Sequence, residues 1–335
     1  SCTVNFCELL MTTMTQLYRI IDPEGLAAAF VEEWQNDKDH ITARTSGSTG
    51  TPKDIHLLKA DMELSARATC RHFGIGPESV LFCPLSTDYI AGKMMIVRAA
   101  VAGATVVVER PSSTPMAHWI LDRADLTAIV PSQIEGLLTN GRGRLRSVIV
   151  GGAPVTPEQE RIMTDSGIDF RATYGMTETC SHVALRRIDS RRFEALPGFS
   201  FHTDDRGCLV IESGSMSFGR LVTNDIVKLH DNMSFQWLGR YDNVIISGGI
   251  KLFPEEIERE IAPYTGSHAF YLTGRKSERW GEELVMVIEC EDVDIEAIDR
   301  ALSLHIDHRH KPKGYIVKRE LPRTPTGKLL RHRIK

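Results

Sequence analysis

Four short runs between Ser79 and Val150 decide the fold: SVLFC at 79–83, TVVVE at 105–109, AIVP at 128–131 and SVIV at 147–150. Each run is rich in β-branched residues, which favours a buried strand. Segments 61–73, 92–102, 116–124 and 157–166 are expected to be helices. Strands that alternate with helices are typical of a parallel sheet covered on both faces. The sequence therefore predicts an α/β fold for this part of the chain.

The alternation of expected strands and helices ends at Gly207. Short strands are expected at 208–212, 217–222, 227–230 and 234–238, separated by turn residues as in a small antiparallel sheet or barrel. A strand at 244–247 and a helix opening at Pro254 follow, and the acidic residues after Pro254 suit the first turn of a helix. Strands at 269–273 and 284–289 and a helix at 295–308 complete the chain. We therefore expect two domains, residues 1–241 and 242–335.

Composition narrows the class of protein. The chain has 335 residues, of which 42% are hydrophobic and 25% charged, which suits a globular protein with a sizeable core. A formal net charge of −4 gives no field that would attract nucleic acid or an anionic membrane. The 7 cysteines form no CxxC pair, which favours a reducing compartment. No apolar run reaches the ~20 residues that span a membrane, so we expect a cytoplasmic location without membrane insertion. The oligomeric state stays open.

The segment TSGSTGTPK, from Thr45 to Lys53, is dense in hydroxyls and glycines and ends in a lysine. Such a loop offers backbone N–H groups, side-chain hydroxyls and an ammonium to phosphate oxygens. It is not a Walker A loop, because Lys53 follows a proline and no Ser or Thr comes next. The alternative, a flexible Ser/Gly linker, fits the composition but does not explain the lysine. The candidate phosphate-binding residues are Thr45, Ser46, Gly47, Ser48, Thr49, Gly50 and Lys53.

Four further motifs follow in order: Gly151-Gly152-Ala153-Pro154, Tyr174-Gly-Met-Thr-Glu178, Thr223-Asn-Asp225 and Pro325-Thr-Gly-Lys328. Taken singly, they have ordinary explanations as a helix cap, a core tyrosine, a turn aspartate and a solvated lysine. As an ordered set they resemble the adenylate-forming superfamily of acyl-CoA synthetases, adenylation domains and luciferases. Matching segments run from Thr45 to Lys328 and include Gly239-Arg240-x-Asp242 and Gly248-Gly249-x-Lys251.

The resemblance implies a large N-terminal α/β domain with a short β-rich segment, and a small mobile α+β C-terminal domain that turns about Asp242. Because the phosphate loop begins at residue 45, we expect the N-terminal domain to be truncated relative to the family. The implied reaction joins a small carboxylic acid to ATP as an acyl-adenylate, with release of pyrophosphate, and then transfers the acyl group to coenzyme A. ATP, Mg²⁺ and coenzyme A are thus the implied cofactors.

The resemblance also implies a role for each motif residue. The Thr45–Lys53 loop would hold the β- and γ-phosphates of ATP. The remaining roles are as follows: Gly151, Gly152, Ala153 and Tyr174 contact adenine, Thr177 the α-phosphate, Glu178 Mg²⁺, and Asp225 and Arg240 the ribose; Lys328 bridges the carboxylate and the α-phosphate; Gly248, Gly249 and Lys251 line the coenzyme A tunnel.

The acyl-pocket segment Pro84–Lys93 departs from the family, in which a histidine or aromatic commonly follows Pro-Leu-x. Here Thr87 stands at that place, and Tyr89 and Lys93 follow. An ammonium near the pocket suits an acid with a second carboxylate, whereas the alternative has Lys93 pointing to solvent; both interpretations stay open. Ser181 and His182 are also expected to approach the pocket. Asn224 replaces a family glycine, a change that asparagine's tolerance of left-handed backbone would make harmless.

Within the superfamily, the short chain and the segments 174–182 and 245–249 look most like the o-succinylbenzoate–CoA ligases of menaquinone synthesis. Two alternatives are kept. One is another enzyme that adenylates an aryl or acyl acid and loads it onto coenzyme A or a carrier protein. The other is a non-catalytic relative that only binds nucleotide, which the joint presence of Glu178, Asp225, Arg240 and Lys328 disfavours.

Overall fold

The computed structural model describes residues 8–12, 17–45, 53–324 and 328–334, with side chains from Tyr18 onward. Contacts divide the chain into two compact units. The first comprises Ser1–Val155, Gln159–Ser200 and Glu212–Arg220, and the second Thr156–Glu158, Phe201–Ile211 and Leu221–Lys335.

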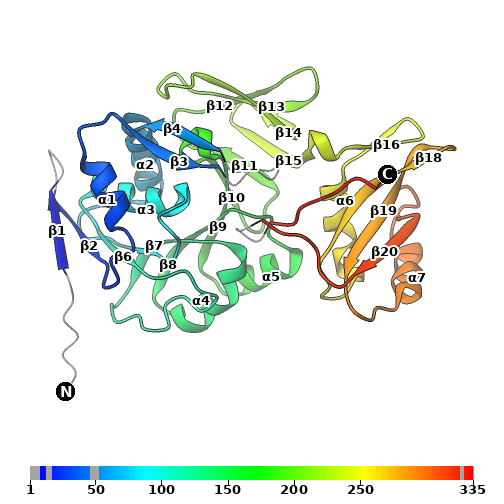
Figure 1. Ribbon diagram of the computed structural model, residues 1–335, viewed down its shortest axis with the longest axis horizontal. Helices are drawn as coiled ribbons and strands as arrows, with labels where there is room; N and C mark the ends of the chain where they lie inside the picture. The colour runs from blue at the N-terminus through cyan, green and yellow to red at the C-terminus, as the bar shows by residue number, and fades with distance from the viewer. Residues whose placement is uncertain (1–7, 13–16, 46–52, 325–327, 335) are drawn as a thin grey trace. The chain divides into compact units, whose positions relative to one another are not determined.

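A mixed sheet forms the centre of the first unit (Figure 1). Its strands, in spatial order, are β1 (Glu8–Thr12), β2 (Leu17–Ile21), β6 (Thr105–Val108), β5 (Val80–Cys83), β7 (Ala124–Ile129), β8 (Leu145–Val150), β9 (Asp169–Gly175), β10 (His182–Arg187) and β11 (Arg192–Ala195). From β2 to β9 all neighbours are parallel. The pairs β1–β2, β9–β10 and β10–β11 are antiparallel. The predicted parallel sheet is confirmed, with antiparallel additions at both ends of this series.

Helices cover both faces of this sheet. α2 (Lys59–Phe73) and α3 (Ile90–Ala102) lie on one face, and α4 (Ile134–Gly141) and α5 (Pro157–Asp165) on the other (Figure 1). α1 (Ala28–Gln35) and the hairpin of β3 (His40–Arg44) and β4 (Asp54–Leu58) complete the unit. α3 is buried on nearly every side, because its residues are almost all small or apolar. Two cations, Lys93 and Arg98, are buried in it.

The helix predicted at 116–124 is wrong. Residues 115–118 form a turn, residues 119–123 are irregular, and β7 begins at Ala124. Met116 adopts a φ of 66°, which a helix does not allow, and Asn140 donates its side-chain amide to the carbonyls of Thr114 and Pro115. Met116 and Trp119 are nevertheless buried in the core cluster under α4. The apolar residues that suggested a helix therefore serve core packing from a turn.

The second unit contains two sheets. One has the strand order β15 (Ser234–Arg240), β14 (Arg220–Asp231), β13 (Cys208–Glu212) and β12 (Ser200–Thr203). The strands predicted separately at 217–222 and 227–230 belong to the single strand β14. Its pairing with β15 shifts register between Ile226 and Val227, so the polar residues Asn224 and Asp225 lie inside a bulged strand rather than in a turn.

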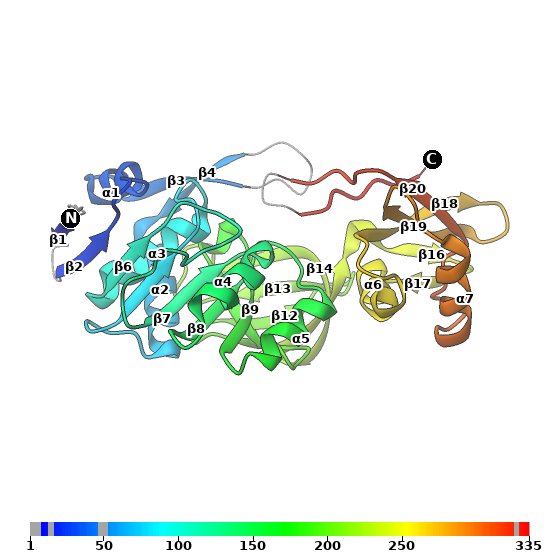
Figure 2. The ribbon, with the colours of Figure 1, turned by 90° about the horizontal axis from the view of Figure 1, so that it is seen from below.

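The smaller sheet runs β17 (Ile250–Leu252), β16 (Ile245–Ser247), β19 (Gly281–Glu289) and β18 (Phe270–Ser277), with β20 (Gly314–Lys318) parallel to β19 (Figure 2). α6 (Pro254–Ile261) and α7 (Ile295–His305) pack against it. Residues 245–302 enclose their own hydrophobic cluster. The domain boundary at 241/242 and the mobility of the last domain stay predictions.

Candidate active site

The phosphate-loop motif lies between the paired strands β3 and β4. The backbone N–H of Thr45 donates to the carbonyl of Lys53 at 2.8 Å, and the Lys53 N–H donates to the Thr45 hydroxyl at 3.1 Å. These two bonds join the first residue of the motif to its last residue. The other candidate residues of the loop, Ser46, Gly47, Ser48, Thr49 and Gly50, lie outside the described residues.

Two of the predicted adenine motifs are adjacent in space. Gly151, Gly152 and Ala153 follow β8, and Tyr174 lies at the end of β9, which pairs with β8 in parallel. The carboxyl ends of neighbouring parallel strands are where α/β sheets bind ligands. A side chain at Gly151 would collide with the Thr173 hydroxyl, so packing already requires glycine there. Gly152 is exposed at φ 84°, and Tyr174 is half-buried.

Thr177 and Glu178 lie on a short 3₁₀ turn directly after β9. Glu178 is exposed, and Thr177 is half-buried. Among the described residues, no three His, Cys, Asp or Glu side chains gather into a metal site. The exposed carboxylate of Glu178 is of the kind that Mg²⁺ takes, since this ion binds one or two carboxylates and completes its shell with substrate phosphates and water. The family resemblance would make Glu178 that ligand.

In the second unit, the structure brings Asp225 and Arg240 together. They are directly opposite in the β14–β15 ladder, and Arg240 Nη1 lies 3.4 Å from Asp225 Oδ1. Asp242 lies 3.5 Å from the other guanidinium nitrogen and is itself exposed. Asn224 does not have a left-handed backbone; its side-chain oxygen accepts a bond of 2.9 Å from Arg206. The explanation predicted for this asparagine is therefore wrong.

Lys328 lies in the same part of the second unit. Burial lowers the pKa of Lys328, and the positive charge of Arg240 lowers it further, whereas Asp225 opposes both. A desolvated ammonium of this kind gains most from an anionic partner. The Lys328 N–H donates to the Thr324 hydroxyl at 3.1 Å, and the Thr324 N–H donates to the Lys328 carbonyl at 2.8 Å.

The predicted coenzyme A loop is a hairpin turn. Ser247 pairs with Ile250, so Gly248 and Gly249 are the two turn residues of β16–β17. Both have positive φ, 57° and 79°, as a type I′ turn requires. Lys251 is exposed on β17.

The acyl-pocket segment leads into α3, and the structure closes one of its two open interpretations. Thr87 is buried and donates its hydroxyl to the carbonyl of Leu26 at 2.9 Å. Tyr89 is half-buried at the start of α3. Lys93 is only 7% exposed, lies 3.4 Å from Glu33 and stands 4.6 Å above the Phe30 ring. The interpretation in which Lys93 points to solvent is therefore wrong, and the side chain already has an acidic partner.

Arg98 is the residue that the sequence analysis missed. It is 2% exposed, and its Nε has no hydrogen-bond partner. Nη2 donates to the Ser181 hydroxyl at 2.6 Å, and Nη1 lies 3.3 Å from the Met95 sulfur. Across the described part of the chain no carboxylate pairs with it. Burial lowers the pKa of Arg98 to about 10, so the guanidinium remains charged at neutral pH.

Ser181 and His182 connect Arg98 to α2. His182 is buried, with Nδ1 3.2 Å from the Ser181 hydroxyl and Nε2 3.0 Å from that of Thr69. Thr69 in turn donates to the carbonyl of Ser65 at 3.2 Å. These contacts form one donor chain from Arg98 to Ser65 when the imidazole is neutral and carries its proton on Nε2. Burial and the charge of Arg98 hold the pKa of His182 well below its usual range, which favours that neutral form.

Residues 32–223 match the family of AMP-binding enzymes. The chain is 27% identical to a 2-succinylbenzoate–CoA ligase of Listeria monocytogenes, over 92% of this chain and 72% of the relative. It is similar to the crystal structure of an acyl-CoA synthetase (AMP-forming)/AMP-acid ligase II-like protein from Dyadobacter fermentans, with 33% identity, a TM-score of 0.61 and 91% of each chain covered. It also shares the fold of O-succinylbenzoate coenzyme A synthetase from Bacillus subtilis, solved with ATP and magnesium, with a TM-score of 0.77 at 21% identity over 87% of this chain and 68% of that one.

The chain therefore belongs to the AMP-binding enzyme family, the adenylate-forming superfamily. It is an AMP-forming acyl-CoA synthetase, that is, an acid–thiol ligase. None of the helices in the described residues is long and apolar enough to cross a membrane.

Proposed function

We propose that the acid activated by this ligase carries a second carboxylate and an aromatic ring, with o-succinylbenzoate as the best candidate. The observation that carries the proposal is Arg98, a buried guanidinium without an acidic partner in the described residues. Burying an unpaired charge is costly, and a ligand carboxylate recovers much of that cost. The named 2-succinylbenzoate–CoA ligase relatives agree with this choice.

Arg98 suits this role better than Lys93. Lys93 has Glu33 at 3.4 Å, so a second anion there would meet a carboxylate as well as the ammonium. Arg98 instead offers an unpaired Nε and a planar, two-pronged donor, which is the geometry that binds carboxylates best.

The remaining site residues keep the roles that the family resemblance implies. In the first step the acid's carboxylate attacks the α-phosphate of ATP, forming the acyl-adenylate and releasing pyrophosphate; in the second, the coenzyme A thiol displaces AMP. Tyr174 and Gly151–Ala153 would contact adenine, Asp225 and Arg240 the ribose, and Thr177 the α-phosphate. Lys328 would stabilise the negative charge that develops between carboxylate and α-phosphate. Glu178 would hold Mg²⁺, which supplies positive charge to the phosphates when bound.

An ATP–pyrophosphate exchange assay across a panel of acids tests the substrate. The panel includes o-succinylbenzoate, its analogue lacking the succinyl carboxylate, benzoate and an aliphatic dicarboxylate. We expect o-succinylbenzoate to be preferred over the analogue by about 100-fold, the value of one charge-paired contact. Preference for a monocarboxylate would instead support an enzyme that loads another aryl or acyl acid, and ATP binding without any exchange would indicate a non-catalytic relative.

Lys328→Ala tests the adenylation step. We expect exchange to fall about 10²–10³-fold, because one donor to the developing charge is lost. Thioester formation from supplied acyl-adenylate and coenzyme A should be spared, since that step does not need Lys328. Lys318→Ala, an exposed lysine on β20, is the matched control and should leave both steps unchanged. Equal loss of both steps in Lys328→Ala would contradict this role.

A further inference from the structure

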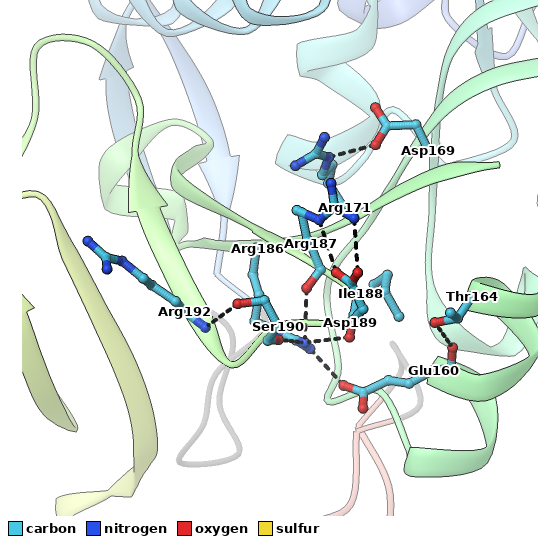
Figure 3. A network of polar contacts seen from close by, with 10 residues as sticks. All are labelled: Glu160, Thr164, Asp169, Arg171, Arg186, Arg187, Ile188, Asp189, Ser190 and Arg192. Carbon is cyan, nitrogen blue, oxygen red and sulfur yellow. Dashed lines mark hydrogen bonds and ion pairs between the residues drawn. The ribbon is translucent and has the colours of Figure 1, made fainter. Parts of the chain in front are cut away.

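A buried ion pair joins α5 to β10 in the first unit. Arg186 Nη2 lies 2.9 Å from Glu160 Oε1, and the two residues are 9% and 7% exposed. Figure 3 shows the pair beneath the turn that follows β10. Glu160 is held in turn by its helix, where the Thr164 hydroxyl donates to its carbonyl at 2.8 Å.

The other nitrogen of the same guanidinium binds the turn itself. Arg186 Nη1 donates to the carbonyl oxygens of Ile188 at 3.2 Å and Ser190 at 2.5 Å, with a longer contact of 3.4 Å to that of Arg187 (Figure 3). One side chain therefore fixes the path of residues 187–190, which lead from β10 into β11. A planar guanidinium does this better than an ammonium, because its donors have a fixed geometry.

The contact that links this network to the candidate site is Phe193 on β11. The Arg186 guanidinium stands 5.6 Å from the centre of the Phe193 ring, within cation–π range. Phe193 in turn meets Tyr174 edge to face, with ring centres 5.8 Å apart and planes inclined by 62°. The order of contact is Glu160, Arg186, Phe193 and Tyr174.

We propose that Arg186 is a positioning residue for the nucleotide base: it holds Phe193, and through Phe193 the plane of the Tyr174 ring. The inference rests on the proposed role of Tyr174 beside adenine. Stacking depends on the orientation of the ring, and Tyr174 is only half-buried, so its own packing constrains it less than a core residue. The contacts of Arg186 named above are to Glu160, the turn carbonyls and Phe193, so its proposed effect on the base passes through Phe193.

Nucleotide binding measured by calorimetry tests the proposal without knowledge of the acid. The ligands are AMP, which has a base, and inorganic tripolyphosphate, which has none. Arg186→Gln should weaken AMP binding by about three- to tenfold, a part of the value of one base–aromatic stack, and leave tripolyphosphate binding unchanged. Arg187→Gln is the matched control, because Arg187 is the next residue on β10 but its partner is the exposed Asp189. It should change neither affinity.

Two more variants make the test specific. Phe193→Leu keeps an apolar side chain but removes the ring, and it should weaken AMP binding as much as Arg186→Gln. The double variant should be no weaker than either single one, because both break the same chain of contacts. Equal loss for AMP and tripolyphosphate, or additive losses in the double variant, would overturn the proposal.

Glu160→Gln covers the case in which Arg186→Gln does not fold, since the amide oxygen can still accept from Arg186. It should show a smaller, base-specific loss; an unchanged AMP affinity in both folded Glu160→Gln and Phe193→Leu would refute the inference. Tyr174→Ala distinguishes a failure of the proposed adenine role of Tyr174 from a failure of the positioning role of Arg186. If it leaves AMP affinity unchanged, the adenine role of Tyr174 is wrong; if it weakens AMP binding while Phe193→Leu does not, only the role of Arg186 is wrong.

Discussion

Arg186 and Arg98, two buried arginines of the first unit, differ in the partners that the protein supplies for their charge. Arg186 has an acid at 2.9 Å and the carbonyls of a turn, so its charge is satisfied by the protein. Arg98 is more deeply buried, yet it has one hydroxyl, one sulfur contact and an Nε without a partner. The first arrangement is what a stabilising ion pair looks like. The second agrees with the proposal that a carboxylate of the substrate supplies the missing partner, since an unpaired buried charge is otherwise a cost.

The largest expected effect is on stability. Arg186→Met should lower the free energy of unfolding by about 3–5 kcal/mol, because the buried carboxylate of Glu160 loses the guanidinium that balances its charge. Arg98→Met should leave stability within about 1 kcal/mol or raise it, since no carboxylate in the described part of the chain loses a partner. Urea titration of the two variants beside the wild type measures both. A comparable loss in Arg98→Met would mean that Arg98 is structural and would remove the basis for a substrate role.

The next effect concerns the acid. In the exchange assay, Arg98→Met should lower activity with o-succinylbenzoate by about 100-fold and leave activity with the analogue lacking the second carboxylate nearly unchanged. A substrate anion that binds elsewhere would leave the ratio between the two acids as in the wild type. The ratio of the two activities is insensitive to general damage to the enzyme, because such damage lowers the activity with both acids alike.

A smaller effect separates the two cations of α3. Lys93→Met should cost about 1–2 kcal/mol of stability, less than a fully buried pair, because Glu33 remains 29% exposed in its side chain. The preference for the dicarboxylic acid should stay as in the wild type, since Lys93 is already paired. A collapse of that preference would place the second carboxylate at Lys93, as one interpretation of the sequence had it.

Much of the fold was predictable because its strands are short β-branched runs with helices between them. The predicted ends of α2 and α5 and the predicted start of α6 lie close to the observed ones, since proline or glycine marks several of them. The failures have physical reasons. Apolar residues at 116–124 looked helical but fill the core from a turn, and Asn224 looked like a turn residue but lies in a bulged strand.

In the candidate site, too, some features could be predicted from the sequence and others could not. Motif residues such as Tyr174, Asp225 and Arg240 could be named as candidates because the motifs, taken in order, resemble those of the adenylate-forming superfamily. The different states of Lys93 and Arg98 could not, because they depend on Glu33 and Ser181, which are distant in sequence. The available signal for Arg98 was an arginine in a helix whose one other charged residue is Lys93, among side chains that are otherwise small or apolar.

The smallest expected effect is on the pH dependence of stability, which we expect from His182 because the charge of Arg98 opposes its protonation. Within the described residues, the groups that face this imidazole are Arg98, His72, Ser181 and Thr69, and the two charged or titratable ones among them oppose its protonation. In the unfolded chain His182 takes a proton below about pH 6.5, whereas in the folded protein its pKa is well below that. Stability should therefore be flat above this pH and fall as the pH drops, by no more than about 1.4 kcal/mol per pH unit for one proton.

The difference in unfolding free energy between wild type and His182→Gln isolates the contribution of His182, because the contributions of titratable groups common to both proteins cancel. Glutamine keeps a donor and an acceptor for Thr69 and Ser181 but does not titrate, so the difference between the two unfolding free energies should shrink or reverse from pH 7 to pH 5. In Arg98→Met the pKa of His182 should rise toward its usual value, and the slope in that background should be shallower. A slope that is the same with and without Arg98 would mean that burial alone holds His182 neutral, and that the guanidinium charge is already neutralised inside the folded protein.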